Sequence, residues 1–435
     1  MNGFNGKLKL VLLAAAASVA AFAAEPLTIE EAVRIAKANA YEVLAAQADS
    51  RRARAVVSEA KGSLLPTVTV DGQYTRFAAE STVVINSKEP PIVIRPIDQK
   101  SVALNLSQRV DIFGVAGLAI SGARALFLAS EAIVASAVND AALRAKSGFL
   151  DVLRAEELVG VADERIANVQ EELRVARLKN QEGAAAKFDV IRFEAELATA
   201  EQERLQAANT LDLAKAAFNE VLARDISTPV ELVKPGPVPA VARPLADLTE
   251  LALQQRPDIV AAARRLDYQN RYRRARQKDG LPALNLSGGI TYNPDAGGLG
   301  GMQSDASATA VLSFPLFDGG TRRARVSQAR ADEDRARILL AQQSRAVEKE
   351  VKQAYLNVES ARQQIETAEK GLELARETLR IARIRYEAGV GTPLELSDAN
   401  VVLVRARTAL VDSTYGYRDA IANLQRAVGI EEIFV

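Results

Sequence analysis

The sequence has no cysteine, no histidine and no tryptophan, and only two methionines among its 435 residues. Without cysteine there is no disulfide framework, thiolate metal site or catalytic thiol. Without histidine the chain lacks the commonest metal ligand and the commonest general base near neutral pH. We therefore expect no metal site and no cofactor. A hydrolytic enzyme has little support, because isolated acidic residues make a weak active site.

An excess of charge of either sign is also missing. The 55 lysines and arginines balance the 55 aspartates and glutamates. A nucleic-acid binder would show a basic excess, so no nucleic-acid partner is expected. Aromatic residues make up only 5% of the chain, which argues against a large aromatic-rich globular core.

The N-terminus has the pattern of an export signal. Two lysines precede an apolar run, Leu10–Ala17, and Ala21 and Ala23 fit the small residues of a cleavage site. We predict a signal peptide over residues 1–23. An uncleaved membrane anchor is the alternative, but the run is shorter than the ~20 apolar residues that span a bilayer. No later run approaches that length, so no further transmembrane helix is expected.

The chain contains an internal repeat. Gly114 and Gly183 recur as Gly320 and Gly389, both at an offset of 206 residues. A proline-rich stretch lies between the two copies, and repeated proline stops helices and favours an extended chain. The predicted organisation is a first structural repeat over 24–226, a linker over 227–246 and a second repeat over 247–435.

Each repeat is predicted to contain a very long helix. The segment between Gly320 and Gly389 has no proline and only one internal glycine. Its apolar and small residues alternate at spacings of four and three, the heptad pattern of coiled coils. They stand at 347, 351, 354, 358, 361, 365, 368, 372, 375, 379, 382 and 386. The first repeat shows the same pattern, so we expect two helices of ~68 residues, each about 100 Å long. A solitary antiparallel hairpin would show the same period, so the period alone leaves the oligomer open.

Shorter helical patterns flank the long ones. One follows each long helix, over Phe188–Leu222 and Leu394–Val428. Another precedes each pair of strand-like segments, over Thr28–Lys61 and Leu248–Lys278. The sequence TIEE that begins at Thr28 fits a capping box at a helix start.

Four segments alternate apolar and polar residues with a period of two. They are Thr67–Arg76, Ser101–Gln108, Leu284–Tyr292 and Ala306–Phe314. Each has one apolar and one polar face, which is typical of transmembrane β-barrel strands. An ordinary sheet packed on the helices is the alternative.

Aromatic residues favour the membrane interpretation, because they crowd the two ends of these strands as interfacial girdles do. They are Tyr74, Phe77 and Tyr292 at one end and Phe113, Phe314 and Phe317 at the other. The connecting segments, Ala78–Lys100 and Asn293–Asp305, are expected to be polar, exposed loops.

Four strands cannot close a barrel, and an open sheet edge is not tolerated in lipid. If the strands lie in a membrane, several chains must share one barrel. Three chains would supply twelve strands, an even number within the known range. The same three chains would supply six helical units to a tube.

Two motifs carry a family resemblance. FPLFDGG at residues 314–320 and RYEAGVGTPLELSDA at residues 385–399, within the duplicated plan, resemble the TolC-like outer-membrane factor family. The resemblance covers nearly the whole mature chain. It implies a mainly α fold with a small β part: a homotrimer with a shared twelve-stranded β-barrel in the outer membrane and a long α-helical barrel in the periplasm. It also implies two partners, a periplasmic adaptor and an inner-membrane pump, for which the channel is a passive exit duct in efflux or type I secretion.

The same resemblance places adaptor contacts at the two glycine turns. These are Gly183, Ala184 and Ala185 in the first repeat and Ala388, Gly389 and Val390 in the second. The first turn is rich in alanine and differs from the second, so it is expected to contact a different face of the adaptor.

A gate is expected beside the second turn. Glu395 and Asp398 are three residues apart and share a helix face, and three copies would form a ring of six carboxylates that attracts cations. Glu395 has a second interpretation, because Thr392 and Pro393 make it the third residue of a capping box. Asp398 lies beyond capping reach.

The matching residues of the first repeat are Asp189 and Arg192. Arg192 is a candidate partner for the acidic residues of a neighbouring chain. Arg385 and Tyr386 are candidates for the same network, although Tyr386 also fits the last position of the heptad pattern.

A periplasmic coiled-coil adaptor or scaffold is the alternative function. It would share the export signal and the heptads. It would also show β-rich globular domains between its helical arms, whereas the four strands found here are all of the membrane type.

Overall fold

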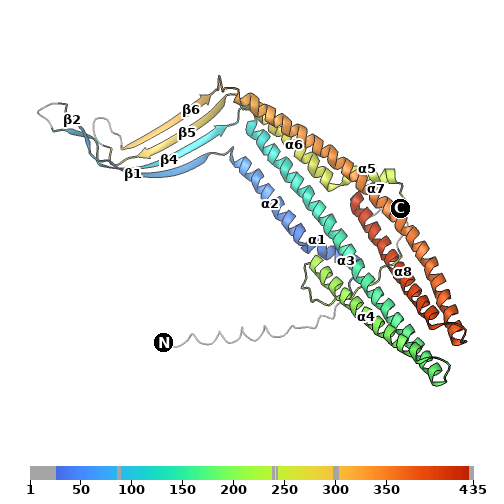
Figure 1. Cartoon of the computed structure of the whole chain (residues 1–435). Helices are drawn as coiled ribbons and strands as arrows, with labels where there is room; N and C mark the ends of the chain where they lie inside the picture. Colours follow the sequence, from blue (N-terminus) through green and yellow to red (C-terminus); the bar gives the residue numbers. More distant parts are fainter. Residues whose placement is uncertain (1–25, 86–89, 238–240, 242, 297–302, 431–435) are drawn as a thin grey trace, which may run out of the picture. The chain divides into compact units, whose positions relative to one another are not determined.

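The computed structural model describes residues 26–85, 90–237, 241, 243–296 and 303–430. The predicted signal peptide lies outside these residues. The chain divides into two compact units, one built from Met1–Leu44, Val138–Thr249 and Glu350–Val435, the other from Ala45–Ala137 and Glu250–Lys349. Each unit draws segments from both predicted repeats. Figure 1 gives the labels of the helices and strands.

The two long helices are confirmed. They are α3 (Val115–Gln181) and α7 (Thr321–Glu387), with 67 residues each. Each begins after a glycine with positive φ, 71° at Gly114 and 87° at Gly320. Asp111 and Asp318 accept hydrogen bonds from backbone N–H groups of the first turns, at 2.7–3.0 Å. Such side chains replace the partners that the first N–H groups of a helix lack.

One property of α3 differs from the sequence-based expectation. The helix contains a window of 18 residues with a mean hydropathy of 1.6, long and apolar enough to cross a membrane by length and composition alone. Length and composition do not distinguish a membrane span from a helix that packs inside a protein. In the unit that contains residues 138–181, α3 packs against other helices of the chain.

The half-length helices begin and end within one residue of the predicted bounds. They are α4 (Lys187–Val221) and α8 (Pro393–Val428). Thr392 caps α8 as predicted, because its hydroxyl accepts the Glu395 N–H at 3.2 Å. Gly429, at φ 84°, ends α8 in the left-handed conformation that suits glycine.

The two shorter helical patterns are each split, which corrects the prediction of single helices. The first gives α1 (Ile29–Asn39) and α2 (Tyr41–Gly62), and the second gives α5 (Leu245–Gln255) and α6 (Pro257–Lys278). Ala40 and Arg256 stand at the breaks with extended ψ values of 133° and 126°. Pro257 explains the second break, since proline suits the first position of a helix and disfavours a helical residue before it.

The four predicted strands form one antiparallel sheet in the second unit (Figure 1). They are β1 (Thr67–Arg76), β4 (Asp98–Val110), β5 (Ala283–Tyr292) and β6 (Ser304–Ser313), in the order β1-β4-β5-β6. Val70 pairs with Leu104, Leu104 with Ile290 and Ile290 with Ala306. Because directly paired residues share a face, the predicted apolar faces of all four strands are confirmed as one continuous face.

The connection between β1 and β4 is not the polar loop that we expected. It contains a two-stranded hairpin, β2 (Ser81–Val83) and β3 (Ile92–Arg95). Its sequence is rich in valine and isoleucine, which favour strands even where they are exposed.

The core of the first unit forms two clusters. One joins α1, α3 and α4 around Phe149 and Phe218, whose ring centroids lie 6.0 Å apart edge to face. The other lies near the turns and contains Leu173 of α3, Phe193 of α4, Leu372 and Tyr386 of α7 and Leu396 of α8. The heptad positions of α7 are buried or half-buried throughout, which confirms the predicted coiled-coil pattern.

Residues 227–237 of the predicted linker form no helix and belong to the same unit. Leu27 forms an isolated parallel bridge with Leu232, and Arg418 of α8 donates to the carbonyls of Pro235 and Gly236 at 3.2 and 2.8 Å. Proline has no backbone N–H, so a proline-rich segment offers few backbone donors to pair with carbonyl groups. A side chain donates to these two carbonyls instead.

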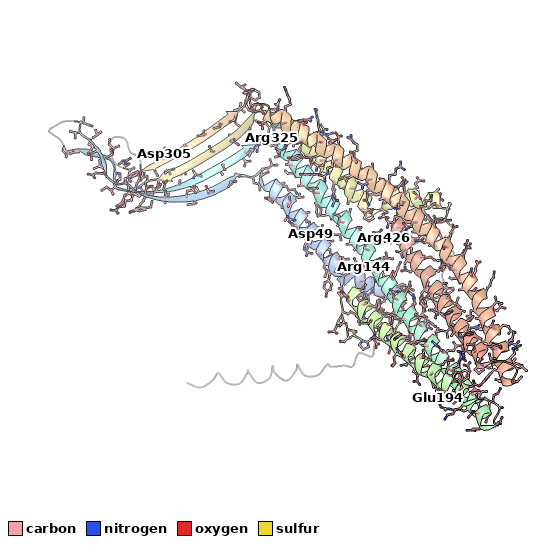
Figure 2. All side chains as sticks on the ribbon, viewed as in Figure 1. Asp49, Arg144, Glu194, Asp305, Arg325 and Arg426 are labelled. Atoms are coloured by element: carbon pink, nitrogen blue, oxygen red, sulfur yellow. The ribbon has the colours of Figure 1, made fainter. Side chains whose placement is uncertain are left out.

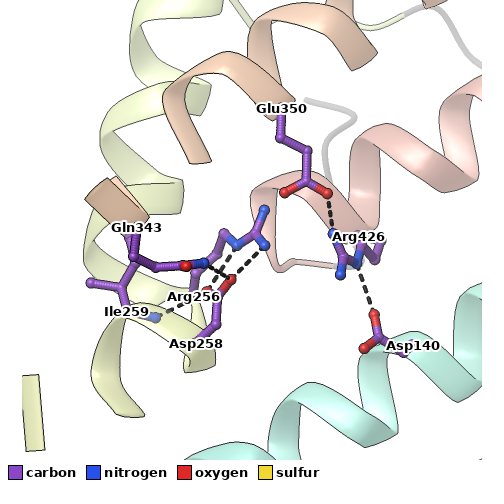
Figure 3. Close-up of polar contacts among 7 residues, drawn as sticks. All are labelled: Asp140, Arg256, Asp258, Ile259, Gln343, Glu350 and Arg426. Carbon is purple, nitrogen blue, oxygen red and sulfur yellow. Dashed lines mark hydrogen bonds and ion pairs between the residues drawn. The ribbon is translucent and has the colours of Figure 1, made fainter. Parts of the chain in front are cut away.

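Small residues dominate the helix contacts of the second unit. Ala123, Ala129, Ala261 and Ala329 are buried on α3, α6 and α7. Gly122 lies so near the Tyr268 ring that a β-carbon there would sit 3.3 Å from it. A polar contact joins α6 to α7: the Asp258 carboxylate accepts from Arg256 at 2.7 Å and from Gln343 at 2.9 Å (Figure 3).

Candidate functional site at the helix turns

The two turns that end the long helices have the same backbone conformation. Gly183 and Gly389 have φ values of 74° and 77°. In the first turn the Lys179 carbonyl accepts from Ala184 and Ala185, at 2.7 and 3.2 Å. In the second, the Arg385 carbonyl accepts from the equivalent residues at 3.0 and 2.9 Å. Such bonds to the last helical carbonyls need a left-handed residue, which glycine adopts without strain.

The predicted contact residues are mostly accessible within one chain. Gly183, Ala184, Ala388, Gly389 and Val390 are exposed, and the Val390 side chain has 70% of its surface free. Ala185 is half-buried. The valine gives the second turn an apolar surface that the alanines of the first turn lack.

Glu395 has two contacts within the chain, one of which confirms its predicted place in the helix cap. Its backbone N–H is bound by Thr392, and its carboxylate lies 3.5 Å from the Arg385 guanidinium. Both side chains are about half exposed, so this ion pair adds little stability. The backbone of Glu395 therefore takes part in the helix cap, while its side chain stays half exposed beside the turn.

Asp398, the strongest of the gate candidates, is exposed one turn further along α8. Across the residues that the structure describes, no hydrogen bond or ion pair joins its carboxylate to another side chain. Its charge is therefore not neutralised within one chain.

The gate candidates from the first repeat, Asp189 and Arg192, are less exposed than Asp398. Arg192 donates to Glu196, one turn along α4, at 3.1 Å, rather than to the acidic residues of α8 in its own chain. Asp189 is half-buried in the first turn of α4. Burial is the main cause of the raised pKa of the Tyr386 phenol, and the negative charge of Asp189 raises that pKa further.

Tyr386 is part of the core, which favours the second of its two predicted interpretations. It is buried, its ring contacts Phe193 edge to face at 6.1 Å, and the Lys179 ammonium lies 4.5 Å from the ring centre. Its hydroxyl is buried without a hydrogen-bond partner in the described chain. Lys179 also donates to the Tyr386 carbonyl, which ties α3 to α7 beside the turns.

Sequence reasoning missed a buried polar pair next to this cluster. Glu172 of α3 has only 2% of its surface exposed, and its Oε1 accepts a hydrogen bond from Asn400 of α8. Burial raises the pKa of Glu172 to about 7. Glu172 Oε2 and Asn400 Oδ1 are both buried without a donor. A proton on Oε2 would supply the donor that the pair lacks, so the raised pKa and the hydrogen bonding agree.

Further polar contacts connect the α3–α4 hairpin to the α7–α8 hairpin. Ser397 donates to Glu196 at 2.7 Å, Arg407 to Glu164 at 2.7 Å and Arg383 to Asn168 at 3.3 Å. Within the first hairpin, Glu194 pairs with Arg177 at 2.7 Å (Figure 2 labels Glu194). The turn region therefore combines exposed acidic groups with partly buried polar contacts between hairpins.

A cleft of about 770 Å³ lies farther from the turns, between α3, α7 and α8 of the same unit. Arg426 closes one side of it by binding Asp140 at 2.8 Å and Glu350 (Figure 3). Asp419 accepts from Ser147 and Asn423. Because these charged groups already have partners within the chain, the cleft does not present a convergent set of groups for a ligand.

Comparisons with known proteins agree with this architecture. A family model described as outer membrane efflux protein matches residues 32–224 and 248–430. CyaE of Bordetella pertussis is 30% identical over 311 residues, which cover 70% of this chain and 65% of CyaE. TolC of Vibrio cholerae is 23% identical over 400 residues, covering 91% of this chain and 89% of TolC.

Solved structures show the same fold. The outer-membrane channel OprN has a TM-score of 0.78 and 22% identity, with 92% of this chain and 89% of OprN covered. The CmeC outer membrane channel of Campylobacter jejuni has a TM-score of 0.79 and 19% identity, with 92% and 85% covered.

Proposed function

Because the chain belongs to the outer membrane efflux protein family, we propose that three copies of it form the exit duct of a tripartite efflux or type I secretion system. The duct conducts substrates passively from a periplasmic adaptor and an inner-membrane pump to the outside. The relatives carry names of both kinds: one is called an alkaline protease secretion protein and another a toluene efflux pump outer membrane protein. Neither name states a reaction, and the proposed duct likewise needs no chemistry of its own.

The observation that carries the proposal is the four-stranded sheet. One of its faces is apolar along every strand, and the large apolar side chains on it are exposed, among them Val70, Leu104, Ile290 and Leu312. In the described chain, the outer edges of β1 and β6 lack a partner strand. An apolar face suits lipid, but open edges do not, because unpaired backbone groups cost several kcal/mol each in hydrocarbon.

Sharing one barrel among copies meets both requirements. The edge of β6 would pair with β1 of the next copy, and three copies of four strands would make a twelve-stranded barrel. Such an arrangement leaves no edge in the membrane.

Exposed apolar side chains on the helices support the same assembly. On α4, Phe188, Ile191 and Leu205 are 53–71% exposed and follow heptad spacing. On α7, Leu374 and Ile381 are seven residues apart and 70% and 46% exposed. We infer that α4 of one copy packs against α7 of the next and continues the coiled-coil wall.

The gate proposal rests on the exposed acids of the second turn. Asp398 and Glu395 of three copies form a ring of carboxylates at the periplasmic entrance, with Arg385 held beside Glu395. Asp189 and Arg192 lie on the neighbouring hairpin and modulate this ring, while Tyr386 packs the hairpin from within.

The adaptor is proposed to contact the two turns. Val390 offers an apolar contact in the second turn, whereas Gly183, Ala184 and Ala185 offer a flatter surface in the first. Two different surfaces per copy give six sites of two kinds per trimer. The chain has no cysteine of its own, so a cysteine introduced at Gly389 would be its single thiol. This thiol is expected to crosslink to the adaptor in the periplasm.

Extraction separates this function from a periplasmic scaffold. The duct remains in the outer-membrane fraction through high salt and alkaline carbonate and needs detergent for release. Release by salt alone would support the scaffold instead. After purification, single-channel conductance in planar bilayers tests whether the particle conducts.

A further inference from the structure

The segment that joins β6 to α7 has an unusual surface. Leu316 and Phe317 are 88% and 91% exposed, the highest values among the large apolar side chains that the structure describes. Arg322, Arg323 and Arg325 follow within eight residues of Phe317, and all three are exposed (Figure 2 labels Arg325). We call residues 314–325 the junction segment.

The three arginines stand where a helix disfavours them. They lie in the first turns of α7, whose N-terminal N–H groups carry partial positive charge. The first turn of α7 holds no acidic residue. At the equivalent positions of α3 the chain has Ala116, Gly117 and Ala119, so the repeat itself does not require cations there. An interaction outside the helix would offset this repulsion, which costs about 0.3–1 kcal/mol for an exposed cation in the first turn.

That interaction is not an ion pair within the chain. Over the described residues, none of the three guanidinium groups forms a salt bridge. Asp318 is the nearest acid in sequence, but its two oxygens accept the backbone N–H groups of Gly320 and Arg322 at 3.0 and 2.7 Å. Neighbouring cations differ in this respect, since Arg273 is paired with Glu333 and Arg276 with Asp279.

The fold makes room for one of these arginines. The Arg322 side chain lies against Gly280, in the turn between α6 and β5, where any β-carbon would collide with it. Lys278, two residues earlier, donates to the Phe113 carbonyl at 2.6 Å. Arg322 therefore lies beside the turn that leads into β5.

We propose that the junction segment anchors anionic glycerophospholipids of the membrane leaflet that faces the periplasm. Phe314, Leu316 and Phe317 insert among the acyl chains, and Arg322, Arg323 and Arg325 bind the headgroup phosphates. This inference rests on the proposed function, because it requires the sheet to span the membrane.

The chemistry and the placement agree. Phe314 follows Leu312 by two residues at the end of β6, so it continues the alternation of the apolar face. Apolar residues followed by basic ones at the end of a membrane strand match the order of acyl chains and headgroups. Arginine binds phosphate through two parallel N–H donors, which favours an anionic headgroup over a zwitterionic one.

The absence of tryptophan from the chain allows a direct test. Phe317→Trp gives each chain a single indole, and Tyr41→Trp, at the exposed start of α2, gives a matched control. In proteoliposomes that contain lipids brominated on their acyl chains, we expect the emission of the Phe317→Trp variant to be blue-shifted and strongly quenched. The emission of the Tyr41→Trp variant is expected to be unquenched. A blue shift without quenching at position 317 would mean that a second copy covers the segment, which overturns the inference.

Headgroup selectivity is tested with a matched set of arginines. The chain carries the tetrapeptide RRAR three times, at Arg322–Arg325, at Arg273–Arg276 in α6 and at Arg51–Arg54 in the interior of α2. Native mass spectrometry counts the lipids retained by trimers from nanodiscs of phosphatidylglycerol and phosphatidylcholine. The variant R322Q/R323Q/R325Q is expected to lose its preference for phosphatidylglycerol at least about tenfold, because each cation near an anionic surface contributes roughly fivefold. The variant R51Q/R52Q/R54Q is expected to keep it.

The outcomes of these experiments distinguish a failure of the lipid-anchor inference from a failure of the proposed exit-duct function. An equal loss of preference in both variants, or in neither, overturns the lipid anchor while the trimer stays intact in the membrane. A wild-type chain that is a soluble monomer without detergent contradicts the proposed function itself. Leu316→Trp replaces Phe317→Trp as the reporter if the latter fails to assemble.

Discussion

At the scale of single residues, the region of the turns contains buried side chains within the hairpins and exposed acidic side chains that we propose form the gate. Tyr386 and Glu172 are buried, while Asp398 and Glu395 are exposed. This separation gives each residue a different experimental consequence, stability for the buried pair and conduction for the exposed one.

Glu172 is predicted to make stability depend on pH. In the unfolded chain its carboxyl ionises near the ordinary pKa of 4.5, whereas in the fold it keeps its proton up to about pH 7. The free energy of unfolding therefore falls as pH rises from 4.5 to 7 and stays lower above 7, by roughly 3 kcal/mol. Glu172→Gln keeps the shape and supplies a permanent donor to Asn400.

We expect Glu172→Gln to raise the thermal midpoint in detergent at pH 8 by several degrees and to leave it unchanged at pH 4.5. Circular dichroism at 222 nm follows the transition. Glu201→Gln is the control, at an exposed position of α4 whose carboxylate forms no hydrogen bond or ion pair within the described residues. Equal midpoints for Glu172→Gln and wild type at pH 8 would show that the carboxyl does not bear this penalty.

Asp398→Asn is predicted to weaken cation attraction at the entrance. Each lost carboxylate removes about 1 kcal/mol of attraction for a monovalent cation 4 Å away in water. The preference for cations over anions, measured as a reversal potential across a salt gradient, should fall, and block by divalent cations should weaken. Asp212→Asn, on the exposed surface of α4, should leave both unchanged. An unaltered reversal potential in Asp398→Asn argues against the carboxylate ring.

Thr392 and Glu172 show which features of the candidate site can be predicted from the sequence and which cannot. Thr392 could be predicted as a cap because the spacing to Glu395 is local. Glu172 could not, because its burial depends on which helix packs beside α3; its counterpart in the second repeat, Thr378, is exposed at the same heptad position. Local chemistry is thus readable from one segment, whereas a buried pair between hairpins is not.

At the scale of secondary structure, the repeat made the helices and strands predictable. Glycine turns fix both ends of α3 and α7, and the alternation of the strands fixes the apolar face of the sheet. The breaks at Ala40 and Arg256 were missed for different reasons. Pro257 was a usable signal, but nothing local marks Ala40, which stands at the corresponding position of the first repeat.

Two glycines of α3 are predicted to respond oppositely to substitution. Gly160 has open space around its α-carbon, so Gly160→Ala should stabilise the helix by about 0.5–1 kcal/mol. A β-carbon at Gly148 would sit 3.2 Å from the Phe218 ring, so Gly148→Ala should cost about 1–3 kcal/mol by crowding the core.

The comparison uses thermal unfolding of the purified protein in detergent, with the two variants and wild type measured side by side. A higher midpoint for Gly160→Ala and a lower one for Gly148→Ala are expected. If the thermal midpoints of both variants are higher than that of wild type, the core around Phe149 and Phe218 accommodates the added methyl group, and the packing described for it is wrong.

At the scale of the whole molecule, we propose that one chain supplies a third of a shared barrel. Its sheet has two open edges, and its helices expose apolar side chains at heptad spacing on α4 and α7. The number of chains that complete it was inferred from the strand count, since a heptad period alone is compatible with several assemblies.

The central claim is that three copies close one barrel, and the mass of the detergent-solubilised particle tests it most directly. Light scattering coupled to size-exclusion chromatography, corrected for bound detergent, should give three chain masses in a single peak. A water-soluble particle of one chain mass, stable after removal of all detergent, would contradict the claim.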